Sequence, residues 1–171
     1  MDDKTDLRIR FKNLRKTFEL GLLSELLTEK IRSSEVYQNA CNVMIFYPTK
    51  YEIDVRGLLE DAGKTFYLPR VNGAELQVCP YCKDDLLEKS AYNIMEPCNK
   101  PVDAKVLDLI IVPALAVDKK NYRLGYGGGF YDRFLAKNLS AKTMVPVSEK
   151  QVVETLPVED FDRPVDFVIT V

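Results

Sequence analysis

Residues 107–137 read LDLIIVPALAVDKKNYRLGYGGGFYDRFLAK, and this stretch decides how the rest of the chain is interpreted. Residues 107–113 form an apolar run with adjacent β-branched residues that ends at a proline, which is typical of a buried strand in a covered sheet. Arg123 and four glycines between 125 and 129 follow, and then a helix-compatible run over 130–137. A strand, a glycine-rich loop and a helix in this order predict an anion site, because glycines let backbone N–H groups approach a phosphate and a helix start adds free donors.

The specificity of this pattern is limited when it is taken alone. Arg123 directly before the glycines can give a bidentate charged contact to phosphate. However, no Gly-Lys-Ser or Gly-Lys-Thr closes the loop, and no Gly-x-Gly-x-x-Gly follows a first strand. A bare glycine cluster is more often a mobile turn. The residues of the loop therefore leave a phosphate site and a plain turn both open.

Length and composition indicate a soluble globular protein. A chain of 171 residues suits one domain, and 46% apolar with 29% charged residues is ordinary for this class. The net charge of −2 gives no reason to expect nucleic acid. No apolar run reaches membrane-spanning length and the start, MDDKTDLRIR, lacks a signal-peptide core, so we expect a cytoplasmic protein without a membrane partner. Histidine is absent, so acid–base chemistry must come from carboxylates, Tyr, Lys, Cys or bound water.

The cysteines suggest two other kinds of site. Cys79-Pro-Tyr-Cys82 looks like a thiol–disulfide exchange motif, but such a motif caps the first strand of its fold, whereas this one lies mid-chain. A zinc site that also uses Cys98 and Cys41 is disfavoured, because Cys41 lies far away and inside an apolar strand pattern. We expect Cys79 and Cys82 to be ordinary residues of a strand and a turn.

The N-terminal part predicts two helices, over residues 5–20 and 22–36. In the first, apolar residues are spaced by four, three and four, as in an amphipathic helix, at Leu7, Phe11, Leu14 and Phe18. The opposite face is basic, and its simplest interpretation is a solvated surface formed by Arg8, Lys12 and Arg15.

The remainder predicts strands that alternate with helices. Residues 42–47 form an apolar strand, a helix capped by Asp54 runs to Ala62, and a strand over 64–68 ends at Pro69. Residues 74–90 are expected to form a strand, a turn and a short helix, and further strands lie near 143–147 and at the C-terminal end. The order predicts an α/β fold in a single three-layer domain, with a mostly parallel central sheet and helices on both faces. Residues 1–38 hold the basic helices and residues 39–171 the α/β body.

Five segments carry a longer pattern. They are 4–8 (KTDLR), 92–97 (YNIMEP), 112–118 (VPALAVD), 123–133 (RLGYGGGFYDR) and 162–170 (DRPVDFVIT). Together they closely resemble the signature of the 5-formyltetrahydrofolate cyclo-ligase family, also called methenyltetrahydrofolate synthetases. The resemblance covers nearly the whole chain.

The resemblance implies an enzyme that converts 5-formyltetrahydrofolate to 5,10-methenyltetrahydrofolate while MgATP becomes ADP and phosphate. It implies nucleotide contacts from Lys4, Arg8, Arg123, Leu124, Gly125, Tyr126, Gly127, Gly128, Gly129, Phe130 and Tyr131. It implies folate contacts from Tyr47, Glu52, Tyr92, Tyr126 and Phe130. It assigns catalytic roles to Arg123 and Tyr131, and magnesium to Asp132 and Asp166. Phosphoryl transfer depends mainly on positioning and charge neutralisation, so the absence of histidine is no obstacle.

Each of these residues also has a simpler interpretation. Glu52 fits a solvated loop carboxylate, Tyr92 a half-buried tyrosine, Tyr131 a core residue, and Asp132 an acid that favours a helix dipole. The chain also departs from the family pattern, at Ala114, Val117, Gly128, Phe130 and Phe161. Two alternatives stay open, which are a catalytically weak folate- or nucleotide-binding paralogue and a thiol–disulfide module. The expected partners are 5-formyltetrahydrofolate and ATP, without nucleic acid, and a monomer is favoured.

Overall fold

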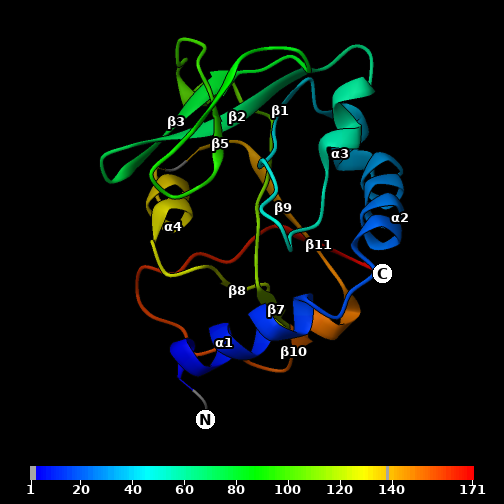
Figure 1. Ribbon diagram of the computed structural model, residues 1–171, viewed down its shortest axis with the longest axis vertical. Coiled ribbons are helices and arrows are strands. Elements are labelled where there is room, and N and C mark those ends of the chain that lie inside the picture. The colour runs from blue at the N-terminus through cyan, green and yellow to red at the C-terminus, as the bar shows by residue number, and fades with distance from the viewer. Residues whose placement is uncertain (1–2, 138) are drawn as a thin grey trace.

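The computed structural model describes residues 3–137 and 139–171, and a six-stranded sheet forms its centre (Figure 1). The strands lie in the order β11-β9-β6-β1-β2-β3. All neighbours pair in parallel except β2 and β3, which form an antiparallel hairpin at one edge. The predicted α/β class with a mostly parallel central sheet is confirmed. The strand bounds are β1 Asn42–Met44, β2 Thr65–Asn72, β3 Glu75–Pro80, β6 Leu109–Ile111, β9 Lys142–Val147 and β11 Phe167–Thr170.

Both faces of this sheet are covered, which explains why its central strands are apolar without interruption. In β6 every residue is buried, with Leu109 and Ile111 in one core and Ile110 in the other. The first core lies under the helices α2 Leu20–Arg32, α3 Glu35–Asn39 and η1 Arg56–Glu60. The second lies under α4 Phe130–Leu135, on the opposite side of the sheet in Figure 1.

A smaller, three-stranded sheet supports α1 Lys4–Arg15, and both lie below the main sheet in the view of Figure 1. Its strands have the order β10-β7-β8, with bounds Val152–Val153, Ala116–Asp118 and Arg123–Leu124. Leu7 and Phe11 of α1 pack there against Leu124. The buried Asp118 carboxylate accepts hydrogen bonds from the N–H groups of Lys120, Tyr122 and Leu156. This carboxylate fixes the turn between β7 and β8, and thereby the position at which Arg123 begins its strand.

The helix boundaries differ from those expected. The first helix ends at Arg15, because the chain tightens into turns in which the Lys16, Thr17 and Phe18 N–H groups each bond three residues back. The expected helix over 22–36 is divided into α2 and α3. Hydroxyls of Ser33 and Ser34 bond to preceding backbone carbonyls there, which competes with a continuous helix.

The region between Asp54 and residue 97 also needs correction. The helix after Asp54 is the 3-10 helix η1, although the Asp54 carboxylate does accept from the Arg56 N–H. Strand β2 does not end at Pro69 but continues to Asn72, since it pairs with β3 over its full second half. Residues 74–90 contain no short helix: after β3 the chain forms β4 Leu87–Lys89, which pairs with β5 Met95–Pro97. The 3-10 helices η2 Ala104–Val106 and η3 Glu149–Gln151 complete the fold.

Within residues 3–137 and 139–171, no helix has the length and apolar character needed to cross a membrane.

Candidate active site

A cavity of about 980 Å³ lies where the carboxyl ends of the parallel strands meet α1. Open α/β sheets collect their ligands at this end of the strands. The structure brings fifteen of the sixteen sequence-predicted site residues to its walls: Lys4, Arg8, Tyr47, Glu52, Tyr92, Arg123, Leu124, Gly125, Tyr126, Gly127, Gly128, Gly129, Phe130, Tyr131 and Asp132.

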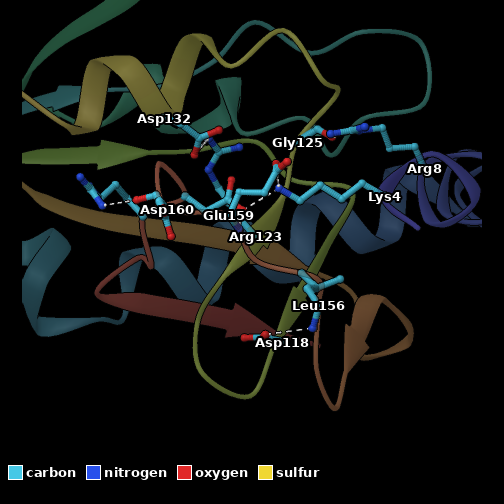
Figure 2. A network of polar contacts seen from close by, with 11 residues as sticks. Lys4, Arg8, Asp118, Arg123, Gly125, Asp132, Leu156, Glu159 and Asp160 are labelled. Atoms are coloured by element: carbon cyan, nitrogen blue, oxygen red, sulfur yellow. Dashed lines mark hydrogen bonds and ion pairs between the residues drawn. The ribbon is translucent and has the colours of Figure 1, made fainter. Parts of the chain in front are cut away.

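The glycine-rich loop runs along one wall and ends at the first residue of α4. Gly127 and Gly129 have φ values of 106° and 67°, in the left-handed region that favours glycine. The Arg8 Nε donates to the Gly125 carbonyl at 3.0 Å, and a Cβ on Gly127 would lie 3.4 Å from the Arg8 guanidinium carbon. Glycine at 127 therefore serves both the backbone conformation and the close approach of Arg8, which Figure 2 shows reaching to the loop.

Arg123 is a buried cation in the wall of the cavity. Its Nη2 lies 3.0 Å from the Asp132 Oδ1, and its side chain is only 4% exposed (Figure 2). Burial lowers the pKa of Arg123, while the neighbouring Asp132 and Tyr131 act in the opposite direction. Among the residues that the structure describes, none offers a hydrogen-bond partner to the buried Nε of Arg123. A buried donor of this kind needs an acceptor, and a phosphate oxygen in the cavity would supply one.

Lys4 reaches the cavity from the start of α1 and meets two acids of the C-terminal segment. Its Nζ lies 2.6 Å from a carboxylate oxygen of Glu159 and 2.6 Å from one of Asp162. The Phe161 ring lies 5.5 Å from the same Nζ. The sequence interpretation assigned no role to Glu159 or Asp162. The half of the cavity that holds the glycines therefore also holds two pairs of a cation and a carboxylate, which are Lys4 with Asp162 and Arg123 with Asp132.

The opposite half is built around Glu52, which is 7% exposed and therefore not the solvated loop residue of the simpler interpretation. Its Oε2 accepts from the Thr49 N–H at 2.7 Å, and its Oε1 accepts from the Tyr126 hydroxyl at 2.5 Å. Burial, and then the charge of Glu52, raise the pKa of Tyr126 far above its ordinary value. Arg15 of α1 donates through Nη1 to the same Tyr126 hydroxyl.

Aromatic side chains complete this half. The Tyr47 hydroxyl accepts from the Arg56 Nη1 at 2.8 Å, and the Arg56 guanidinium stacks on the Tyr47 ring. Tyr92 is exposed, and its ring meets that of Phe130 edge to face at a centroid distance of 5.5 Å. An apolar, aromatic wall beside a buried carboxylate suits a flat heterocycle that carries N–H donors.

Asp166 is the one predicted site residue that lies elsewhere. It precedes β11, and its carboxylate accepts from the N–H and the hydroxyl of Thr143 near the start of β9. That is the amino end of the parallel strands, away from the cavity. Asp162 lines the cavity instead. The two aspartates lie four residues apart in the sequence, and their spacing alone does not tell which one faces the site.

Arg15 was also missed, because its charge favoured a position in solvent. It is 5% exposed and continues the buried face of α1 at four-residue intervals after Leu7 and Phe11. This spacing was the available signal, since residues i, i+4 and i+8 share one side of a helix.

The environment of the cysteine motif is unfavourable for thiol–disulfide exchange. Cys79 is buried in β3, and burial raises the pKa of its thiol, which is the opposite of the shift that thiol–disulfide exchange requires. Cys82 is exposed in the turn that follows β3.

No group of three or more His, Cys, Asp or Glu side chains in the described ranges is arranged to hold a metal ion by protein ligands alone. Magnesium seldom needs such a group, because it is usually held by one or two carboxylates together with substrate phosphates and water. Asp132 and Asp162 are acids of this kind. In the structure Asp132 is paired with Arg123 and Asp162 with Lys4, and either cation could bind a phosphate instead.

Comparison with known proteins identifies the family. A sequence model described as the 5-formyltetrahydrofolate cyclo-ligase family matches residues 1–171. The chain belongs to this family. It is similar to the 5-formyltetrahydrofolate cyclo-ligase of Escherichia coli K12, with 36% identity over 143 residues, covering 77% of this chain and 78% of the relative. The corresponding mouse enzyme is 29% identical over 164 residues, covering 85% and 81%.

A solved structure supports the same assignment. The fold is similar to the 5,10-methenyltetrahydrofolate synthetase of Aquifex aeolicus, with a TM-score of 0.85 and 31% identity, covering 98% of this chain and 89% of the other. The family resemblance inferred from the five sequence segments is therefore confirmed. This cyclo-ligase family member is an enzyme, and its cavity is the candidate active site.

Proposed function

We propose that the protein converts 5-formyltetrahydrofolate to 5,10-methenyltetrahydrofolate at the expense of ATP. One observation carries the proposal: phosphate-type cations beside a glycine-rich loop and a buried carboxylate beside an aromatic wall line a single cavity. Two substrates can therefore be held with their reacting atoms adjacent, which converts a bimolecular step into an effectively unimolecular one.

In the proposed reaction the formyl oxygen attacks the γ-phosphorus and the bond to the ADP oxygen breaks. The second folate nitrogen then attacks the activated formyl carbon and releases its proton to water, the ring closes, and phosphate leaves with the former formyl oxygen. The chain supplies no covalent intermediate in this scheme. Lys4, Arg8 and Arg123 neutralise charge on the phosphates, and the N–H groups of the loop orient them.

Folate is held in the other half of the cavity. The Glu52 carboxylate has two oxygens, each of which accepts one protein hydrogen bond and retains further acceptor capacity. It can therefore receive the exocyclic amine and a ring N–H of the pteridine, while Tyr47 and Tyr92 pack on the ring. The Tyr131 ring lines the same cavity with its centroid 5.5 Å from the Arg123 guanidinium, and we retain Tyr131 as a catalytic candidate.

Magnesium is proposed to enter with ATP, and Asp132 with Asp162 would hold it. When bound, the ion neutralises phosphate charge and fixes the geometry of the polyphosphate. Asp166 has no part in this proposal. Because one chain supplies every wall of the cavity, we propose that a monomer is sufficient.

The test is the growth of methenyl-product absorbance from 5-formyltetrahydrofolate with and without MgATP. Product that depends on both ATP and magnesium supports the proposal. Folded protein that binds both ligands but forms no product would identify a catalytically weak binding paralogue.

A further inference from the structure

Arg15 is a buried cation whose guanidinium contacts both the loop after β1 and the glycine-rich loop. Its side chain is 6% exposed, and a buried arginine is costly unless its donors are paired. The Nε donates to the Tyr51 carbonyl at 2.7 Å, Nη1 donates to the Tyr126 hydroxyl, and Nη2 lies 3.8 Å from the Glu52 Oε1. The three nitrogens thus reach the loop after β1 and the glycine-rich loop together.

Tyr126 is the link between these two loops. It lies in the glycine-rich loop between Gly125 and Gly127. These two glycines have no side chain that could anchor the loop by packing. Its hydroxyl donates to Glu52 and accepts from Arg15, so a single oxygen joins α1, the glycine-rich loop and the Glu52 carboxylate. The Tyr126 ring lies 5.6 Å from the Arg15 guanidinium, which also faces it.

The geometry points to Arg15 as a positioning residue, which acts through the Tyr126 hydroxyl so that folate and nucleotide each strengthen the binding of the other. This inference rests on the proposed function. A pteridine bound to Glu52 holds the acceptor of the Tyr126 hydroxyl in place, and through it holds the glycine-rich loop in the position that meets ATP. ATP that orders the loop likewise presents Glu52 to the pteridine. A ligand that binds a site already ordered loses less conformational entropy, which is positive coupling.

The coupling can be measured with ligands that cannot react together. Calorimetric titration gives the Kd of the β,γ-imido analogue of ATP, with magnesium, in the absence and in the presence of saturating 5-formyltetrahydrofolate. For the wild-type protein we expect the folate to lower this Kd by at least about fivefold, and the reverse titration must give the same factor by linkage.

Three variants isolate the link. Tyr126→Phe removes only the hydroxyl, and Arg15→Met removes the guanidinium while keeping an unbranched side chain. Each single variant should reduce the ratio of the Kd without folate to the Kd with folate to no more than about two. The double variant should show the same ratio as the single variants, because both changes break the same connection. Tyr51→Phe is the matched control: it also removes one tyrosine hydroxyl, but Arg15 contacts only the Tyr51 carbonyl, so the wild-type factor should persist.

The outcomes separate this inference from the function on which it rests. A wild-type protein that makes the methenyl product but shows no coupling overturns the inference alone. The same holds if Tyr126→Phe, folded by its thermal midpoint, keeps the wild-type factor. Arg15 with a purely structural role would lower the thermal midpoint and leave the factor unchanged. Wild-type protein that binds neither ligand would overturn the proposed function itself.

Discussion

Replacement of Glu52 by glutamine should weaken folate binding specifically. The structure gives the count of hydrogen bonds. One carboxylate oxygen accepts from the Thr49 N–H and the other from the Tyr126 hydroxyl, and each keeps a lone pair for the pteridine. In Glu52→Gln the amide oxygen must face Thr49, since an NH₂ group there would oppose another donor. The NH₂ group then faces Tyr126 and the pteridine, where it cannot accept.

One pteridine N–H is thereby left without its charged acceptor in a desolvated pocket. The loss of such a hydrogen bond costs about 2–3 kcal/mol. This corresponds to about a 30- to 140-fold increase in the Kd for 5-formyltetrahydrofolate. The exchange also leaves Arg15 without its nearest anion, so a lower thermal midpoint is expected in addition.

Calorimetric titration of each ligand alone checks this prediction. The affinity for the imido analogue of ATP, measured without folate, should change by no more than about twofold, because the Glu52 oxygens accept from Thr49 and Tyr126 and not from the cations that the proposal assigns to phosphate. Glu154→Gln is the matched control, since it removes the same charge from an exposed pair with Lys119. Unchanged folate affinity in folded Glu52→Gln would refute the reasoning.

Three further predictions concern other parts of the cavity and the cysteines. Arg123→Ala should lower turnover by about a hundredfold with little change in folate affinity, and steady-state kinetics with wild-type turnover at saturating ATP would exclude the phosphate role. Asp162→Asn should raise the magnesium concentration needed for half-maximal rate, whereas Asp166→Asn should keep the wild-type requirement and lower unfolding free energy by about 1 kcal/mol; a magnesium titration with the reverse ranking would return Asp166 to the site. Cys79→Ala with Cys82→Ser should keep turnover within about tenfold, and a larger loss in a folded protein would contradict their assignment as structural residues.

The sequence was sufficient for the class of fold because the apolar runs of β1, β6 and β9 are continuous, as strands covered on both faces require. It was not sufficient for the end of β2. Pro69 favoured a strand end there, but it lies beyond the last residue that pairs with β1, so the N–H that proline lacks is not needed on that side. The hairpin with β3 then extends the strand to Asn72.

The candidate site likewise has residues that the sequence could predict and residues that it could not. Residues of the glycine-rich loop could be assigned because they are consecutive in the chain, so a single local motif brings all of them to the cavity wall. Asp162 and Asp166 could not be separated, since the turn in which Asp162 accepts from the Glu159 N–H decides which carboxylate faces inward. Arg15 was placed in solvent because residue type outweighed its four-residue spacing from Phe11. A pairing between segments 37 residues or more apart, such as Arg15 with Glu52, depends on the tertiary fold.

The central claim is that the formyl oxygen of the folate becomes an oxygen of the released phosphate. The measurement that tests it most directly uses 5-formyltetrahydrofolate labelled with oxygen-18 in the formyl group, turned over with unlabelled MgATP. Mass spectrometry of the phosphate should then find one labelled oxygen for each methenyl product formed. Unlabelled phosphate accompanied by methenyl product would contradict the phosphorylation of the formyl oxygen and the roles assigned to the cavity on that basis.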